Sequence, residues 1–406
     1  MREIGLAFLY LSATIRIREL ATFGFHAMKF RSNFPGVAIT VIAPKRLAPK
    51  PVNLLSMSID LNSREAVTAL DPKGMLHFTE EYPNQCRHAL TLVEGVEFPT
   101  GTYTAAMLTG LGGSAVGGDY VRAMFDAFGS IPFVVNRDYH LPSYVGKSTL
   151  VFATSYSGNT EETLSAYADA KKAGAQVICV TSGGKLKEQA LADGYPVITV
   201  PGGQPPRTAL GFMLIPVLAA CVKMGLLPAQ DFAKAFDLLE SLCKEWTVEG
   251  SNPIAKELGS SLHGKLGIIY GLGTWQAIIA NRWKGQINEN AKNHVFVNAF
   301  PELNHNEILG WVKAGEQGVG QYVGMILEDG VESAKMKKRA EVTEGLVKDL
   351  CSFAYVTAVG DTLLEKLLSL TYLGDFVSLY LAVLNQVDPE NIDSINILKT
   401  SLASVS

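Results

Sequence analysis

The chain has 406 residues, of which 48% are hydrophobic and 18% charged, which is enough apolar material for a large buried core. Its formal net charge of −4 argues against a general nucleic-acid-binding surface, and its longest uncharged runs are too short or too interrupted to span a membrane. The five cysteines lie far apart without metal-ligand spacing, as is typical of proteins in a reducing compartment. We therefore expect a cytoplasmic protein that binds neither nucleic acid, nor membrane, nor metal.

Residues 1–56 differ from the rest of the chain because they are basic, with eight lysines and arginines but only two acidic residues, Glu3 and Glu19. Targeting peptides have this composition, so one interpretation is a targeting segment. The other, which we favour, is an extension of uncertain role upstream of a translation start at Met57.

Residues 57–230 are expected to form a first module. A largely helical opening over 70–95 is followed by short apolar runs that alternate with turns and amphipathic helices. This alternation predicts a parallel sheet covered by helices on both faces. The expected strands are Ala105–Thr109, Pro132–Asn136, Leu150–Thr154, Val177–Thr181 and Val197–Val200. The expected helices are 114–127 and 160–173, followed by a long helical stretch over 207–246.

The same rhythm restarts in residues 231–406, which are expected to form a second module with linker and C-terminal helices. Because a strand, a glycine turn and a helix open both modules, at 105–127 and 267–290, we expect an internal repeat of topology. The expected strands are Gly267–Gly271, Val295–Ala299, Val323–Leu327 and Phe353–Val359. The expected helices are 276–290, 362–386 and 392–401. The predicted fold class is therefore α/β, with two tandem parallel sheets flanked by helices.

A serine-rich loop follows the third expected strand and opens a helix. Ligands of parallel α/β sheets bind at this edge, and a helix N-terminus stabilises an anion. Ser155, Ser157 and Thr160 add hydroxyl donors, and Gly158 lets the backbone approach a ligand. An ordinary N-cap needs one hydroxyl, so this loop predicts a phosphate site. It contains no lysine and is therefore not a nucleotide P-loop.

A glycine turn at 110–114 joins the first expected strand to its helix and includes Gly113 and Ser114. It could be a dinucleotide fingerprint, but a lone match of this kind is weak. Next to the serine-rich loop, we interpret it as the second wall of one small anionic pocket.

The motifs at 112–114 and 155–160, Gly-Gly-Ser and Ser-Tyr-Ser-Gly-Asn-Thr, resemble the sugar isomerase (SIS) domain. Together with the motifs at 206–210, 288–292 and 301–306, they are similar to the bifunctional phosphoglucose/phosphomannose isomerase family. The resemblance covers the chain except for its N-terminal extension. It implies two tandem SIS subdomains with flavodoxin-like sheets, assembled as a homodimer.

The resemblance also implies an isomerase that interconverts glucose 6-phosphate, and mannose 6-phosphate, with fructose 6-phosphate through a cis-enediol, without cofactor or metal. Glu289 matches the family's catalytic base, and Arg207 matches the arginine near the enediolate. His305 matches the histidine that assists ring opening and is contributed across the dimer interface. Lys399 matches the C-terminal lysine at the sugar ring. The residues that match the phosphate site are Gly113, Ser114, Ser155, Ser157 and Thr160.

These residue types suit the chemistry. One carboxylate can carry a proton between adjacent carbons, an arginine stabilises an enediolate, and a histidine titrates near neutral pH. In some family members a threonine that helps to admit mannose 6-phosphate lies seven residues before the lysine. Ile392 occupies this position here, which weakens the expectation for mannose 6-phosphate and leaves that for glucose 6-phosphate intact.

Two alternatives stay open. One is another SIS isomerase acting on an aminosugar or pentose phosphate, although such enzymes usually carry extra modules that we do not find in this sequence. The other is a non-catalytic sugar-phosphate sensor. Sensors that regulate transcription typically carry a basic helix-turn-helix domain, and the basic residues 1–56 show no clear helix pair of that kind. A sensor would also have no use for Glu289.

Overall fold

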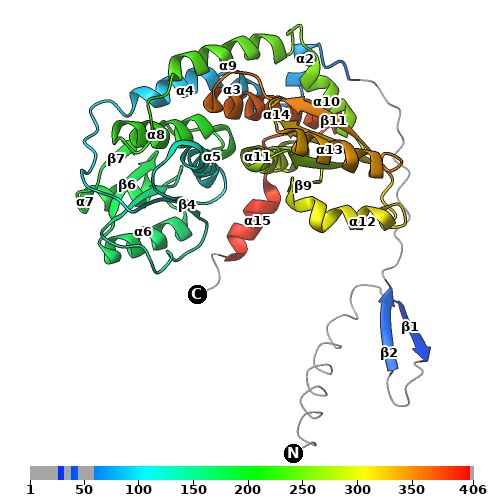
Figure 1. Cartoon of the computed structure of the whole chain (residues 1–406), viewed down its shortest axis with the longest axis horizontal. Coiled ribbons are helices and arrows are strands. Elements are labelled where there is room, and N and C mark those ends of the chain that lie inside the picture. The colour runs from blue at the N-terminus through cyan, green and yellow to red at the C-terminus, as the bar shows by residue number, and fades with distance from the viewer. Residues whose placement is uncertain (1–25, 32–37, 44–58, 403–406) are drawn as a thin grey trace, which may run out of the picture. The chain divides into compact units, whose positions relative to one another are not determined.

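The computed structural model describes residues 26–31, 38–43 and 59–402, and the chain divides into two compact units, 1–58 and 59–406. In the first unit, β1 (His26–Arg31) and β2 (Ala38–Ala43) pair as an antiparallel hairpin. The rest of residues 1–56 lies outside the described residues, as does Met57, so both interpretations of this segment stay predictions. The second unit contains both predicted sheets (Figure 1).

The first sheet of the second unit is parallel, with strand order β4-β3-β5-β6-β7. Its chain path reverses direction between β3 and β5, which is where doubly wound sheets bind ligands. Its strands are β3 (Ala105–Thr109), β4 (Phe133–Asn136), β5 (Thr149–Thr154), β6 (Gln176–Thr181) and β7 (Val197–Thr199). Its helices are α5 (Gly113–Phe128), α6 (Glu161–Ala173), α7 (Gly184–Ala192) and α8 (Leu210–Lys223).

The second sheet is also parallel, with strand order β11-β10-β8-β9, so β8 takes the place of β3 and β10 that of β5. Its strands are β8 (Leu266–Gly271), β9 (Val295–Ala299), β10 (Tyr322–Glu328) and β11 (Cys351–Thr357). Its helices are α11 (Thr274–Ala291), α12 (Glu307–Ala314), α13 (Ala334–Val347) and α14 (Leu363–Leu384). The expected two-sheet α/β architecture and its repeat of topology are confirmed.

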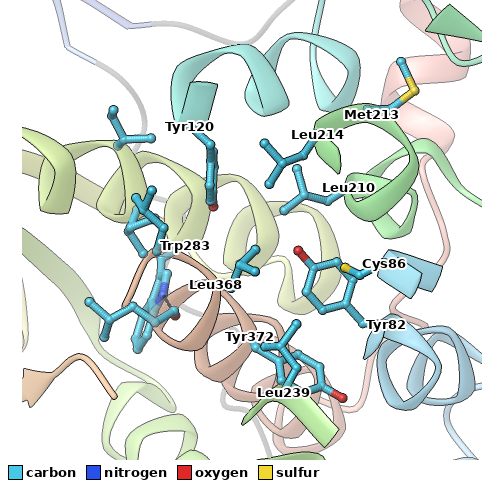
Figure 2. Close-up of a cluster of buried hydrophobic side chains, with 14 of the residues drawn as sticks. Tyr82, Cys86, Tyr120, Leu210, Met213, Leu214, Leu239, Trp283, Leu368 and Tyr372 are labelled. Atoms are coloured by element: carbon cyan, nitrogen blue, oxygen red, sulfur yellow. Dashed lines mark hydrogen bonds between the residues drawn. The ribbon is translucent and has the colours of Figure 1, made fainter. Parts of the chain in front are cut away.

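A shared core lies between the two sheets. Alternate residues of a strand point to opposite faces, so Leu108 and Phe152 pack into this core while Met107 and Val151 pack under α6 and α7. Helices α5, α8, α11 and α14 fill the layer, together with α9 (Phe232–Trp246) and α10 (Ile254–Leu262). Figure 2 shows side chains of α4 (Tyr82–Thr91), α5, α8, α9, α11 and α14 meeting there. Helix α4 belongs to the helical opening of the second unit, together with α2 (Arg64–Thr68) and α3 (Met75–Glu80).

The expected single helical stretch over 207–246 is wrong in one respect, because it is two helices. Helix α8 ends at Lys223, and Gly225 follows with a φ of 72°. A glycine in the left-handed region commonly ends a helix, and Pro228 cannot donate a backbone hydrogen bond to continue it. Helix α9 then starts at Phe232.

Helix α14 is the one described helix that is long and apolar enough to cross a membrane. Of its most hydrophobic window, 94% is buried inside the protein, between α10 and α11 among other elements. Its composition is that of a core helix packed on all sides.

Candidate active site

The two loops predicted to bind phosphate lie against each other at the carboxyl edge of the first sheet. The backbone N–H of Tyr156 donates to Ser114 Oγ at 3.0 Å, and Thr154 Oγ1 donates to the Ser114 carbonyl at 3.0 Å. The N-termini of α5 and α6 therefore open side by side. Their unpaired backbone N–H groups and partial positive charges favour an anion at this position.

The hydroxyl groups of the serine-rich loop are arranged without capping α6. Ser155 Oγ accepts from the N–H of Gly158 at 3.1 Å and lies 2.9 Å from Thr160 Oγ1. Thr160 is the N-cap residue, yet its side chain makes no capping hydrogen bond. Ser157 is exposed. The hydroxyls of Ser157 and Thr160 are thus positioned where a ligand could recruit them.

Gly158 is required by the shape of this loop. Its φ is +70°, and an added Cβ would stand 1.8 Å from the carbonyl oxygen of Gly183. Any side chain would therefore push the loop away from the turn at 181–184, which supports it.

Arg207 is brought to the same edge by η2 (Pro206–Thr208), a short 3₁₀ helix that follows β7. An added Cβ on Gly113 would lie 2.8 Å from the Pro206 carbonyl, so the glycine turn and η2 are in direct contact. Arg207 is 5% exposed, and burial lowers its pKa although the neighbouring carboxylates of Glu289 and Glu390 oppose this. Its Nη1 lies 3.6 Å from Oε2 of Glu289, whose side chain is 39% exposed.

The rest of the Arg207 guanidinium is held by the second module. Nε donates to Asn290 Oδ1 at 2.7 Å, and Nη2 donates to the carbonyls of Pro389 at 2.6 Å and Glu390 at 3.1 Å. Asn290 was not expected to have a role of its own, although it lies in the motif at 288–292.

Lys292, at the end of the same motif, is the other residue that sequence reasoning missed. Its Nζ donates to the carbonyls of Glu289 and Asp388, each at 2.7 Å. Burial, and then the positive charge of Arg207, lowers its pKa. Lys292 and Arg207 therefore hold the loop at 388–390 against the end of α11.

His305 lies far from Glu289 within one chain. It ends η3 (Glu302–His305), which follows β9 at the carboxyl edge of the second sheet. Glu302, at the start of η3, and Thr274, the first residue of α11, line the same cavity of about 520 Å³, so η3 lies near the start of α11. Glu289 lies fifteen residues further along α11, roughly 22 Å away at 1.5 Å per residue. The structure thus brings Arg207 and Glu289 together but places His305, which is exposed, at the other end of the module.

Lys399 is exposed on the C-terminal helix α15 (Asp393–Leu402). Among residues 59–402 it forms no hydrogen bond or ion pair with Glu289 or Arg207. The loop before α15 is the one that Arg207 and Lys292 hold, so α15 starts beside the candidate site.

The second module has no counterpart of the serine-rich loop in the described residues. The loop after β10 presents Glu332, whose carboxylate accepts from the N–H groups of Asp329 and, at 2.9 Å, Gly330. Gln276 Nε2 donates to the same carboxylate at 3.3 Å. An internal carboxylate therefore occupies the place that an external anion would take in the first module.

No group of three or more His, Cys, Asp or Glu side chains in the described ranges is arranged to hold a metal ion. The two loops, Arg207 and Glu289 form the candidate site, with helix N-terminal backbone groups, which favour an anion, at one end. A buried cation and an accessible carboxylate lie at the other. This arrangement suits a phosphorylated substrate from which a proton is removed.

Comparison with known proteins gives two family matches and several similar proteins. Residues 104–193 match the SIS domain family, and residues 252–402 match the bacterial phospho-glucose isomerase C-terminal SIS domain. A bifunctional phosphoglucose/phosphomannose isomerase of Caldicellulosiruptor bescii is 46% identical over 305 residues, covering 74% of this chain and 89% of the relative. The enzyme of the same name from Thermoplasma acidophilum is 35% identical over 306 residues, covering 75% and 92%. A hypothetical protein of Thermus thermophilus shares the fold, with a TM-score of 0.63 at 18% identity over 84% of this chain and 93% of that one.

Proposed function

Because the chain belongs to the bifunctional phosphoglucose/phosphomannose isomerase family, we propose that it interconverts glucose 6-phosphate and mannose 6-phosphate with fructose 6-phosphate. The observation that carries this proposal is the pairing of Arg207 with Glu289 at 3.6 Å, next to the serine-rich loop. We place the enzyme in the cytoplasm, in agreement with five cysteines that are all free thiols.

The substrate phosphate binds between the N-termini of α5 and α6. Backbone N–H groups supply most of the donors, because Thr160 leaves the first turn of α6 without a side-chain cap. The side-chain hydroxyls add uncharged hydrogen-bond donors for the phosphate oxygens. The phosphate-binding residues in this proposal are Gly113, Ser114, Ser155, Ser157 and Thr160.

Glu289 removes a proton from one carbon of the open-chain sugar and returns it to the neighbouring carbon. Its partly exposed carboxylate is accessible to substrate, and a positioned base of this kind contributes roughly 10²–10⁴-fold to the rate. The negative charge of the enediolate develops beside Arg207, whose burial strengthens the attraction relative to water. The carboxylate and the guanidinium thus divide the work of proton transfer and charge stabilisation.

Ring opening requires His305 of the partner subunit in a homodimer. Two observations support this assignment: His305 and Glu289 of one chain lie at opposite ends of the second module, and His305 is exposed. Helix α12, which follows His305, carries Leu309 and Val312 with exposures of 71% and 76%. Exposed apolar side chains of this kind fit a subunit interface. Lys399 on α15 completes the site at the sugar ring.

Mannose 6-phosphate is included because the curated relatives bear the bifunctional name. Ile392 lies just before α15, where some members carry threonine. Glucose 6-phosphate and mannose 6-phosphate differ only in the orientation of one hydroxyl, at C2. We therefore expect this part of the site to set the relative rates at which the two epimers react, and Glu289 to act on both.

Purified protein incubated with fructose 6-phosphate tests the proposal, with glucose 6-phosphate and mannose 6-phosphate measured separately. We expect both products, and we expect Glu289→Gln to lose about 10²–10⁴-fold in kcat while substrate binding persists. Glu316→Gln, a change in a surface ion pair, is the matched control. A wild-type protein that forms neither product would contradict the enzyme assignment and favour a sugar-phosphate sensor.

A further inference from the structure

Arg207 belongs to a ring of buried polar side chains that joins the two modules. Arg207 comes from η2, Arg282 and Asn290 from α11, and Asp375 and Ser378 from α14. Each of the five is buried, with exposures between 0% and 7%. Such groups are costly to bury unless every one of them finds a partner.

The ring closes through hydrogen bonds in both directions from Arg207. On one side, Arg207 Nε donates to Asn290 Oδ1 at 2.7 Å, and Asn290 Nδ2 donates to Ser378 Oγ at 2.9 Å. Ser378 Oγ in turn donates to the Asp375 carbonyl at 2.7 Å. On the other side, Arg282 Nη2 donates to the Arg207 carbonyl at 2.8 Å and to Asp375 Oδ1 at 3.2 Å. Both the backbone and the side chain of Arg207 are thus fixed to α11 and α14.

A purely stabilising role explains this ring poorly. Buried ion pairs such as Arg282 with Asp375 can often be replaced by apolar side chains of similar volume without loss of stability. The same interface already has a large apolar core, in which Trp283 packs against α14 (Figure 2). What the ring adds is a fixed orientation of the Arg207 guanidinium, because hydrogen bonds are directional and apolar contacts are not.

The orientation that results matches the needs of the reaction. Nε and Nη2 of Arg207 are bonded to Asn290 and to the carbonyls at 389–390, which leaves the Nη1 edge facing Glu289. Asn290 is the next residue after Glu289, and consecutive helix positions point about 100° apart. Helix α11 therefore points Asn290 into the core and Glu289 toward the site. The same helix fixes the positions of both side chains relative to each other.

We propose that Asn290 is a positioning residue that, with Ser378 behind it, aligns the Arg207 guanidinium with Glu289 and the enediolate. This inference rests on the proposed function, because it requires that Arg207 acts on the reacting sugar. The residue does not touch the substrate, so its removal should lower kcat more than it alters substrate binding.

Asn290→Leu tests this role, because leucine keeps a similar volume but offers no acceptor to Arg207 Nε. We expect kcat to fall by about 10–100-fold with KM changed less than about threefold, as for a misplaced catalytic group. Asn290→Asp restores the acceptor, and Ser378 can rotate to donate to it, so we expect at least half of the lost kcat to return on a logarithmic scale. Ser378→Ala removes the support of Asn290 and should give a smaller loss in the same direction.

Trp283→Phe is the matched control, because it removes the buried hydrogen bond to the Leu370 carbonyl between the same two helices. We expect Trp283→Phe to lower the melting temperature as Asn290→Leu does but to keep the wild-type kcat. A loss of kcat in Asn290→Leu then reflects misalignment of Arg207 and not destabilisation. If Asn290→Leu keeps the kcat of that control in an active wild-type background, the positioning role is wrong while the isomerase assignment stands. If Asn290→Leu does not fold, Ser378→Ala decides, and an unchanged kcat there overturns the proposal. A wild type without isomerase activity removes both.

Discussion

Oε2 of Glu289 lies 3.6 Å from Nη1 of Arg207, and the two residues come from different modules of the chain. Arg207 follows the last strand of the first sheet, whereas Glu289 lies in the last turn of α11 in the second module. The pair therefore exists only when the two modules are docked. Because the serine-rich loop belongs to the first module, docking also fixes the distance between this loop, the proposed phosphate anchor, and Glu289, the proposed base.

Replacing Arg207 by lysine should impair catalysis more than its conserved charge suggests. A lysine ammonium cannot bond Asn290 and the carbonyls at 389–390 while also facing Glu289, because it lacks the planar fork of a guanidinium. We expect kcat/KM to fall by about 10²–10³-fold, measured in the coupled assay with fructose 6-phosphate. Arg87→Lys, which changes surface ion pairs and one hydrogen bond to the Phe236 carbonyl, should keep wild-type activity. Equal losses in both variants would contradict this expectation.

Gly158→Ala should damage the phosphate loop. An alanine at φ +70° is strained, and its Cβ would lie 1.8 Å from the Gly183 carbonyl, so the loop must move. We expect a destabilisation of about 1–3 kcal/mol in urea unfolding and a raised KM for the sugar phosphate. Gly146→Ala is the control, since its added Cβ meets nothing within 4 Å. A Gly158→Ala protein with unchanged KM would show that this loop does not hold the phosphate.

Mixing two inactive variants should restore activity if His305 is donated between subunits. A hybrid of Glu289→Gln and His305→Ala subunits contains one site with both native groups and one with neither. With random exchange at equal amounts, half of the dimers are hybrids, so about a quarter of wild-type activity is expected. Mixing is checked by native mass spectrometry of tagged subunits. Hybrids that form without any recovery would place His305 and Glu289 outside a shared site.

The free energy of unfolding should fall in mild alkali because buried thiols ionise only after unfolding. Burial raises the pKa of Cys86 to about 12, whereas a thiol in the unfolded chain ionises near 8.5. The unfolded state therefore loses this proton first. The contribution of Cys86 is complete below about pH 8 and declines as pH rises toward 12, by up to about 1.4 kcal/mol per pH unit.

Urea unfolding at pH 8.0 and 9.5 measures this effect. Burial raises the pKa of Cys179 and Cys351 to about 12 as well, so the three thiols act in the same direction. Cys86→Ala should show a smaller loss between the two pH values than the wild type. An identical loss in both proteins would rule out Cys86 as a contributor.

Asp375→Ala should be strongly destabilising because it leaves Arg282 charged and buried. Although burial opposes the cation, the Asp375 carboxylate raises the pKa of Arg282, so the two charges depend on each other. Removing one partner of a buried pair costs about 3–5 kcal/mol. Thermal unfolding checks this, with Asp361→Ala, a change at the surface ion pair with Lys234, as the control. A similar melting temperature in both variants would contradict the buried-pair assignment.

Local pattern was sufficient to predict the strands. The strands at 105–109 and 295–299 were predicted at their observed bounds, because short apolar runs and flanking turns are properties of neighbouring residues. Helix α13 was missed because only three of its side chains, Ala340, Thr343 and Val347, are buried, so it carries no apolar stripe. Helix α12 was missed as well, because it is short and Gly310 interrupts its apolar pattern.

The sequence by itself determined two α/β modules and a serine-rich loop at a helix N-terminus, and its resemblance to a family singled out Arg207, Glu289 and His305. Only the tertiary structure decided that Arg207 and Glu289 meet while His305 lies at the far end of the module. It also decided that Asn290 holds Arg207 across 83 positions of sequence. The physical reason is range: hydrogen bonds within helices and side-chain alternation are set by neighbouring residues, whereas the docking of two modules depends on surfaces that no short segment contains.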